Sequence, residues 1–251
     1  MLIYGINPVL EALRTGRVTR LRVGPRSDRR IEEALALART RGVSVERVAV
    51  DVLERAARGQ AHQGIVAELD AAEDYSIADL VARAAPAPPL IVVLDGIEDP
   101  HNVGAILRTA DAAGVHGVVR QARRAAALDG AVAKASAGAL AHVRVATVVN
   151  IARAVEELKA SGVWTIGLAG DASESYDSVD FTLPTAVVLG AEGSGLRRLV
   201  RERCDRVVSI PMRGAVQSVN VSVAGGIVLF EAVRQRRVGV ARRGGRGSEE
   251  P

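Results

Sequence analysis

Cysteine is nearly absent from this chain, which excludes one common way of holding a fold together. Cys204 is the only cysteine in 251 residues, so no disulfide can form within the chain. The four histidines are His62, His101, His116 and His142. They lie too far apart in the sequence for the ligand spacing of a zinc site. We therefore expect no structural metal.

Long apolar runs are also missing. The longest aliphatic stretches are short, such as IVVL at 91–94, whereas a membrane-spanning helix needs roughly 20 apolar residues. The first ten residues have no basic leader and contain Gly5, Asn7 and Pro8, which is not the pattern of a signal peptide. The sequence predicts a cytoplasmic protein that does not cross a membrane.

Aromatic residues and lysine are scarce, which limits the ways of binding a nucleic acid. The chain has one Trp, three Tyr and two Phe, too few for an aromatic platform that stacks RNA bases. Lys134 and Lys159 are the only lysines among 33 basic residues, so arginine dominates. Arginine suits phosphate and base contacts. A GC-rich coding sequence is the simpler explanation of the bias, so the positions of the arginines are more informative than their number.

Positive charge gathers in two segments. Residues 232–251 carry six arginines and two glutamates, a difference equal to the formal net charge of +4 of the whole chain. Within 14–30 the only acidic residue is Asp28, and the basic residues are Arg14, Arg17, Arg20, Arg22, Arg26, Arg29 and Arg30. This basic patch fits RNA or another polyanion, and a charged face that contacts only solvent is the alternative.

The length and the ordinary balance of 48% hydrophobic and 25% charged residues allow two globular domains. Short strand and helix patterns alternate through residues 1–72, where Asn7 and Pro8 are predicted to begin the first helix. The proline-rich APAPPL at 85–90 marks the domain boundary. LIVVLD at 90–95 then has the continuous apolar character of a parallel strand covered on both faces. Further strands are expected near 115–119, 142–145, 163–169, 186–190 and 206–210, and helices near 102–113, 150–161, 194–203 and 218–236.

Three segments that follow predicted strands have the residues of a ligand site. They are DGIEDPHNVGAILRTADAAG (95–114), LGAEGSGL (189–196) and IPMRGAVQSVNVSVAGG (210–226). Ligands bind at the carboxyl ends of the strands in an open parallel sheet, so we expect the three segments to converge.

The first segment is predicted to form a helix capped by Asn102. Its apolar face is Ile106, Leu107 and Ala110, which leaves Arg108 free to face a cleft. An ordinary surface arginine is the alternative interpretation.

Glycines and small polar residues characterise the other two segments. Gly190, Gly193 and Gly195 surround Glu192 and allow backbone amides to approach a ligand, although a plain tight turn has the same composition. The spacing matches neither the dinucleotide-binding GxGxxG nor the P-loop. In the third segment Gln217, Ser218 and Asn220 precede a helix start, where an anionic group is favoured.

Together the three segments resemble, in this order, the three motifs of the SpoU (TrmH-like) RNA ribose 2′-O-methyltransferases of the SPOUT superfamily. YGINPVLEAL at 4–13 and HQGIVA at 62–67 are similar to the family's substrate-binding domain, so the resemblance covers nearly the whole chain. It implies an α/β protein whose C-terminal SPOUT domain has a parallel sheet and a deep trefoil knot around S-adenosyl-L-methionine. A small L30e-like α/β domain precedes it, and the family is normally homodimeric.

The resemblance also implies a division of the chain. The expected parts are an RNA substrate-binding domain at 1–75, a linker at 76–89, the knotted methyltransferase domain at 90–238 and a disordered basic tail at 239–251.

Site residues follow from the motif positions that match. The catalytic candidates are Asn102, Arg108, Glu192, Ser218 and Asn220. Backbone at Gly190, Ile210 and Val219, with Leu168 from the adjoining strand, is expected to enclose the cofactor. Val219 replaces the usual leucine of the family, which affects packing on the adenine rather than the chemistry. The RNA-binding candidates are Arg14, Arg17, Arg20, Arg22 and Arg26.

The implied reaction is methylation of a ribose 2′-hydroxyl in 23S rRNA, at a guanosine of the peptidyl-transferase P loop. The expected partners are 23S rRNA or a pre-ribosomal particle and a second copy of the chain. Alternative substrates are tRNA and an antibiotic-resistance site in rRNA. A catalytically silent RNA-binding assembly factor and an enzyme acting on a small nucleotide are the alternatives outside this class.

Overall fold

The computed structural model describes residues 1–26, 28–70 and 73–244. These residues form two compact units. The first unit contains Met1–Glu73, Asp99–Arg108 and Ala126–Val143. The second contains Asp74–Glu98, Thr109–Ala125 and the described chain from Arg144 onward. Both units combine strands and helices, which confirms the predicted α/β class.

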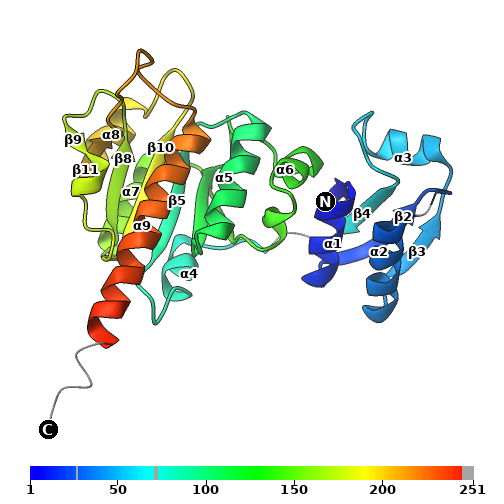
Figure 1. Ribbon diagram of the computed structural model, residues 1–251. Coiled ribbons are helices and arrows are strands. Elements are labelled where there is room, and N and C mark those ends of the chain that lie inside the picture. Colours follow the sequence, from blue (N-terminus) through cyan, green and yellow to red (C-terminus); the bar gives the residue numbers. More distant parts are fainter. Residues whose placement is uncertain (27, 71–72, 245–251) are drawn as a thin grey trace, which may run out of the picture. The chain divides into compact units, whose positions relative to one another are not determined.

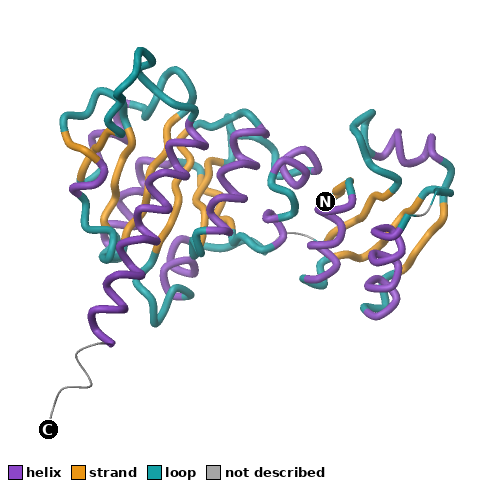
Figure 2. Tube along the Cα trace, in the orientation of Figure 1, coloured by secondary structure: helices purple, strands orange, loops and turns teal. Residues whose placement is uncertain are grey.

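A four-stranded mixed sheet forms the centre of the first unit (Figures 1 and 2). Its strands, in spatial order, are β1 (Leu2–Tyr4), β4 (Ile65–Leu69), β2 (Val18–Val23) and β3 (Ser44–Arg47). Strand β2 runs parallel to β3, and β4 runs antiparallel to both β1 and β2. The helices that accompany this sheet in the sequence are α1 (Ile6–Arg14), α2 (Arg29–Thr40) and α3 (Val50–Ala56).

Helix α1 begins earlier than the sequence predicts. Its N-cap is Gly5, with φ of 94°, and Asn7 lies inside the first turn. The backbone amide of Ile6 donates a 3.0 Å hydrogen bond to Gln63 Oε1, a side chain far along the chain. A helix start needs an acceptor for its free amides, and here a distant residue supplies it, so the local Asn-Pro signal was misleading.

Two short helical segments of the first unit were not predicted. They are α6 (Gly130–Ala135) and the 3₁₀ turn η1 (Ala139–Ala141). Helix α6 lies against β1 so closely that a Cβ on Gly130 would stand 2.2 Å from Tyr4 Cε1. Such a short, alanine-rich stretch has no recognisable apolar periodicity, because its placement depends on the close approach that glycine permits.

The second unit is built on a seven-stranded sheet in which every pairing is parallel. In spatial order the strands are β7 (Val145–Val148), β6 (Gly117–Gln121), β5 (Leu90–Asp95), β10 (Thr185–Gly190), β8 (Trp164–Leu168), β11 (Arg206–Ser209) and β9 (Glu174–Ser175). The six residues of β5 are all buried, as the continuous apolar run predicted. Strand β7 starts at Val145, where the predicted strand near 142–145 was to end, and the two-residue strand β9 was not predicted.

Helices cover both faces of this sheet (Figures 1 and 2). On one face α4 (Ile77–Ala82), α7 (Ile151–Ala160) and α8 (Arg198–Arg203) share a core with Ile91 and Val93 of β5. On the other face lie α5 (Pro100–Ala112) and the long α9 (Val221–Gly244). A Cβ on Gly225 of α9 would stand 2.9 Å from Leu189 Cδ1, so the helix packs closely on β10.

The segment at 76–89, predicted as a linker, contains α4. Ser76 and Asp79 form the capping box that the sequence indicated, with the Asp79 amide 3.1 Å from Ser76 Oγ. Leu80 of this helix is fully buried in the core of the second unit. The expected domain boundaries stay predictions.

The end of α9 corrects one expectation. The helix continues to Gly244, so 239–244 are helical where a disordered tail was predicted from 239. Arginine, alanine and valine permit a helix to continue until the glycine run that starts at Gly244. The remaining part of the predicted tail, 245–251, lies outside the described residues.

The described residues contain neither a membrane-spanning helix nor a cluster of metal ligands. None of the described helices is long and apolar enough to cross a membrane. In the same part of the chain there is no group of three or more His, Cys, Asp or Glu side chains placed to hold a metal ion.

Candidate functional site

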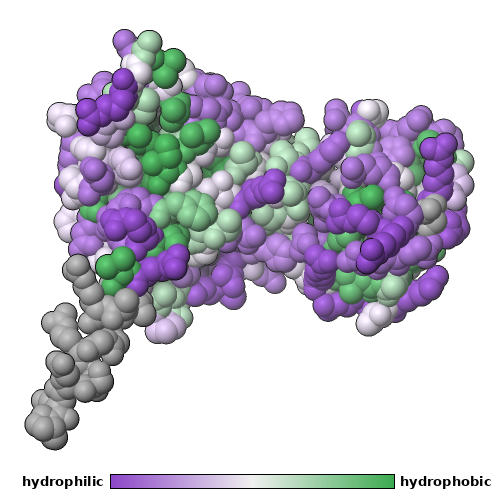
Figure 3. All heavy atoms as spheres, viewed as in Figure 1, coloured by the Kyte–Doolittle hydropathy of each residue, from purple (hydrophilic) through white to green (hydrophobic). Residues whose placement is uncertain are grey.

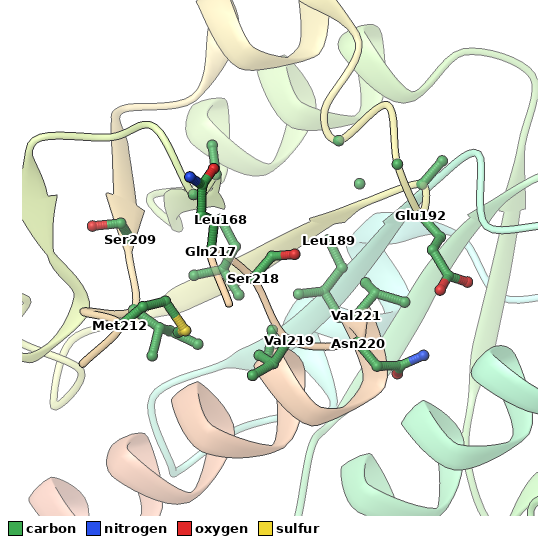
Figure 4. Close-up of a pocket in the computed structure, with 18 of the residues that line it drawn as sticks. Leu168, Leu189, Glu192, Ser209, Met212, Gln217, Ser218, Val219, Asn220 and Val221 are labelled. Atoms are coloured by element: carbon green, nitrogen blue, oxygen red, sulfur yellow. The ribbon is translucent and has the colours of Figure 1, made fainter. Parts of the chain in front are cut away.

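A cavity of roughly 390 Å³ opens in the second unit, where the strand ends β8, β10 and β11 meet the start of α9 (Figure 4). This volume lies within the range of sites that hold small molecules and cofactors. The lining residues come from four separate segments: 168–170, 189–195, 208–212 and 217–224. The position agrees with the rule that an open parallel sheet binds ligands at the carboxyl ends of its strands.

The cavity brings together most of the residues predicted from the sequence. Those that line it are Leu168, Gly190, Glu192, Ile210, Ser218, Val219 and Asn220. Figure 4 shows Glu192 and Asn220 toward one end, with Ser209 and Met212 toward the other. The second and third motif segments therefore converge, as predicted.

Some lining residues were not singled out from the sequence. Ala169 and Gly170 directly follow β8, and Met212 lies two residues after Ile210. Their position after predicted strands was the available signal, but alanine, glycine and methionine have no chemistry that would attract attention.

The loop after β10 is a compact turn that forms one wall of the cavity. The amide of Gly195 donates to the Ala191 carbonyl at 2.8 Å, and the Ala191 amide donates to the Gly195 carbonyl at 3.1 Å. Gly193 and Gly195 have φ of 78° and 66°, a region that residues with a Cβ rarely adopt. This turn places Glu192 at the cavity.

Asn220 has a structural task at the start of α9. Its Oδ1 accepts hydrogen bonds from the Ser222 amide at 2.8 Å and from Ser222 Oγ at 2.6 Å. This arrangement caps the helix and places its free amides at the cavity. The segment before it, which includes the exposed Ser218, has no regular secondary structure, and residues 217–219 line the same space.

Asn102 and Arg108, the candidates from the first motif, lie on α5 and are not among the described residues that line the cavity. Asn102 does not cap the helix as predicted. Asp99 does so, because its carboxylate accepts from the amides of His101 at 3.0 Å and Asn102 at 3.3 Å. The sequence did contain this signal, because Asp99 directly precedes Pro100, and proline is favoured at the first position of a helix. Asn102 lies inside the first turn and is buried.

Arg108 is exposed and lies off the apolar face of α5, as the sequence predicts. The next residue, Thr109, lies beside α9, where a Cβ on Gly226 would be 3.6 Å from Thr109 Cγ2. Arg108 therefore stands one residue from the contact between α5 and the helix that the third motif begins.

Cys204 is excluded from nucleophilic chemistry. Burial raises the pKa of its thiol to about 12, and Asp205 acts in the same direction. Its Sγ donates to the Val200 carbonyl at 3.3 Å. A thiol in this state stays protonated near neutral pH, so it has a packing role.

The basic patch of the first unit is partly neutralised by acidic residues from other segments. Arg14 pairs with Glu33 at 2.9 Å, and Arg22 pairs with Glu68 at 2.6 Å. Nη2 of Arg17 is buried without a hydrogen-bond partner among the described residues.

Arg20 and Arg26 are both exposed, and no ion pair to either is found in the described part of the chain. Of the five predicted RNA-binding arginines, these two are the most available to a partner.

Comparison with known proteins places this architecture. The profile of the SpoU rRNA Methylase family matches residues 89–230, and that of RNA 2′-O ribose methyltransferase substrate binding matches residues 2–75. The chain belongs to the SpoU rRNA methylase family. The resemblance drawn from the three motifs is confirmed, and the α/β fold with a small N-terminal domain agrees with it.

Individual relatives cover most of the chain. The 23S rRNA (guanosine-2′-O-)-methyltransferase RlmB of Ralstonia nicotianae is 47% identical over 213 residues, which are 85% of this chain and 86% of the relative. The putative TrmH family tRNA/rRNA methyltransferase YacO of Bacillus subtilis is 40% identical over 238 residues, which are 93% of this chain and 95% of the relative.

One of the similar solved structures is a SpoU methyltransferase with its cofactor bound. The SpoU methyltransferase AviRb from Streptomyces viridochromogenes, in complex with AdoMet, superposes with a TM-score of 0.79 at 28% identity. The match covers 95% of this chain and 91% of AviRb.

Proposed function

We propose that this SpoU-family chain transfers a methyl group from S-adenosyl-L-methionine to the ribose 2′-hydroxyl of a guanosine in 23S rRNA. The observation that carries the proposal is the convergence of the second and third family motifs on one cavity of the second unit. The names of the RlmB relatives supply the substrate, and a cytoplasmic location accords with it.

The cavity fits S-adenosyl-L-methionine in size and in the character of its walls. Leu168, Leu189 and Val221 provide apolar surface, while the backbone of Gly190 stands so close to Gly195 that no side chain fits there. A wall of bare backbone allows hydrogen bonds to an adenine or a carboxylate. We assign Gly190, Ile210, Val219 and Leu168 to hold the cofactor, which when bound supplies a methyl group on a positively charged sulfur.

The residues of the chain must align the ribose oxygen and stabilise it as its proton leaves. We assign Glu192, Ser218 and Asn220 to alignment, because their polar groups line one cavity. Holding the reacting groups in place can contribute about 7–11 kcal/mol to lowering the barrier.

Arg108 and Asn102 complete the proposed catalytic set by their match to the first motif. Arg108 stabilises the developing oxyanion electrostatically, because a guanidinium keeps its proton in proteins and is a poor proton acceptor. The imidazole of His101 is the alternative proton acceptor, and it stands at the start of the same helix.

RNA recognition is assigned to the first unit. Its match to a substrate-binding family supports this assignment, and so do the exposed guanidinium groups of Arg20 and Arg26. Arg14 and Arg22 would contribute when an RNA phosphate replaces the glutamate carboxylate that each of them binds. Arg17, which is half-buried, would contribute through the accessible part of its side chain.

The proposed active form is a homodimer with a trefoil knot in each methyltransferase domain. Apolar side chains gather along α9 (Figure 3), where Val223 and Phe230 are each 51% exposed and Val238 is 42% exposed. An exposed apolar stripe on a long helix is typical of a protein contact. The family match supports the knot, and the sheet order, in which the late strand β10 lies between β5 and β8, is compatible with it.

Methyl transfer to separated RNA substrates tests the function. The wild type and Arg108→Ala are incubated with labelled S-adenosyl-L-methionine and either unmodified 23S rRNA or bulk tRNA. Label at a single ribose of the 23S rRNA P loop, lost in the variant, is the expected result. Label on tRNA alone would show that the substrate is tRNA and not 23S rRNA. The relative YacO is named a tRNA/rRNA methyltransferase, so both RNAs are tested. Binding of cofactor without label on either RNA would favour a silent RNA-binding factor.

A further inference from the structure

The wall loop, defined here as residues 191–197, is attached to the rest of the second unit by its last two residues. Leu196 is buried in the core that also contains Ile91 and Val93 of β5. Within the loop the hydrogen bonds are local, between Ala191 and Gly195 and from the Ser194 amide to the Glu192 carbonyl at 3.0 Å. These bonds shape the turn but do not fix its position over the sheet. Arg197 supplies a polar attachment to the sheet.

Asp95 receives this attachment at the end of β5. Its side chain is fully buried, and its residue stands opposite Gly190 in the register of β5 and β10. Oδ2 accepts from the Arg197 amide at 2.8 Å, and Oδ1 accepts from Arg197 Nε at 2.6 Å. A buried carboxylate that loses its partner strongly destabilises the folded protein. The charge-assisted hydrogen bonds between Asp95 and Arg197 therefore hold the two residues in one geometry.

The same guanidinium reaches a third strand. Arg197 Nη2 donates to Gln121 Oε1 at 2.8 Å, and Gln121 is the last residue of β6. Since β6, β5 and β10 are neighbours in the sheet, Arg197 joins three adjacent strand ends. None of these three polar residues lines the cavity, so their effect on the site acts through the loop.

We propose that Arg197 is a positioning residue for the methyltransferase reaction. Through Asp95 and Gln121 it fixes the wall loop before the cofactor arrives, and so sets the position of the Glu192 carboxylate and of the backbone beside Gly190. A loop that is ordered in advance does not lose its conformational freedom on binding, which strengthens binding. The inference rests on the proposed function, because it takes the cavity to be the cofactor site.

Arg197→Lys and Gln121→Ala are the decisive variants. The lysine keeps the positive charge near Asp95 but has no planar fork, and the alanine removes only the outer hydrogen bond. Arg197→Ala is a further variant that leaves the buried Asp95 carboxylate without its guanidinium partner. If this variant does not fold, Arg197→Lys and Gln121→Ala decide the test. Arg198→Ala is the matched control, because the Arg198 side chain is 83% exposed and pairs only with Glu202 in the described structure.

Two measurements on the whole protein avoid dependence on turnover. Hydrogen exchange of the peptide that contains 191–197 is followed without ligand, with peptides from α7 as an internal reference. The dissociation constant of S-adenosylhomocysteine is measured by calorimetry. We expect faster exchange confined to the wall loop and a dissociation constant raised about tenfold for Arg197→Lys, which corresponds to about 1.4 kcal/mol, with a smaller rise for Gln121→Ala.

The steady-state kinetics should separate positioning from general damage. We expect a higher KM for the cofactor and a lower kcat in Arg197→Lys, because both the wall and Glu192 move, while the melting temperature stays close to that of Arg198→Ala. Exchange and binding in Arg197→Lys and Gln121→Ala that equal those of Arg198→Ala would overturn the proposal. A wild type that fails to bind S-adenosylhomocysteine would refute the proposed function instead, and the exchange measurement would still test the anchoring.

Discussion

Gly190 and Gly195 approach so closely that a Cβ on Gly190 would stand 2.2 Å from the carbonyl carbon of Gly195. Real Cβ atoms do not reach this distance, so one backbone segment would have to move. The two residues bracket the turn that places Glu192, and both line the cavity.

Gly190→Ala is therefore expected to weaken cofactor binding by at least about tenfold, or about 1.4 kcal/mol. The control is Gly214→Ala, because a Cβ there meets nothing within 4 Å. Calorimetric titration with S-adenosylhomocysteine measures the effect, and circular dichroism checks that the variant is folded. Equal dissociation constants for the two variants would contradict the role of this close approach.

Substitutions of Asn220 should separate helix capping from catalysis. Asn220→Ala removes the acceptor for the Ser222 amide and should lower the free energy of unfolding by about 1 kcal/mol. Asn220→Asp keeps that acceptor but loses the amide donor, so stability should remain while methyl transfer falls. Denaturant unfolding and single-turnover assays measure the two effects. Full activity in Asn220→Asp would leave Asn220 with the capping role alone.

The stability of the second unit should decline as the pH falls below neutrality, in part because of His116. Burial lowers the pKa of His116 below its ordinary value of 6.5, and Arg236 acts in the same direction. A lowered pKa means that the folded state binds the proton less readily than the unfolded state. The stabilisation is therefore present above pH 6.5 and is lost as the pH falls through the lower folded pKa.

The variant His116→Asn keeps an acceptor for the Leu90 amide, which His116 Nδ1 accepts at 3.0 Å. Its free energy of unfolding should change less than that of the wild type between pH 7.5 and pH 5.5. Urea unfolding at the two pH values measures the difference. The same pH dependence in both proteins would remove His116 as the cause.

Neutralising Arg20 and Arg26 should weaken RNA binding without altering cofactor binding. Each lost phosphate contact should reduce the slope of log K against log salt by about 1. Arg55→Ala is a suitable control, because Arg55 is already paired with Asp51 at 2.8 Å. Binding of a 23S rRNA fragment across a salt titration measures the slope. A slope unchanged by Arg20→Ala with Arg26→Ala would reject this surface.

A charge on the apolar stripe of α9 should prevent dimer formation. Phe230→Glu places a carboxylate in the centre of the stripe, and burying it would cost several kcal/mol. Leu199→Glu on α8 is the control, since Leu199 is 44% exposed away from α9. Sedimentation velocity should show a monomer for Phe230→Glu alone. A dimer in both variants would place the contact elsewhere.

The sequence alone determined the fold class and predicted seven residues that line the cavity, while Asn102 and Arg108 are not among the described residues that line it. The apolar run 90–94 is buried in a parallel sheet, and a strand of this kind is recognisable because both of its faces are covered and its residues are continuously apolar. The glycines around Glu192 and the polar residues Ser218 and Asn220 before a helix start indicated a ligand site, and the resemblance to the family motifs then made these three residues candidates. Their shared cavity was expected from the geometry of parallel sheets, in which all carboxyl ends meet at one edge.

Tertiary structure decided the features that depend on distant partners. Gln63 supplies the acceptor at the start of α1, so the local Asn7 signal failed. The basic patch appeared nearly free of acidic residues along the chain, yet Glu33 and Glu68 pair with Arg14 and Arg22 in space.

The attachment of the wall loop is likewise invisible in the sequence, because Asp95 and Arg197 are 102 residues apart. Local patterns record which residues prefer a strand, a turn or a helix, whereas a hydrogen bond or an ion pair depends on where the folded chain brings its two partners together.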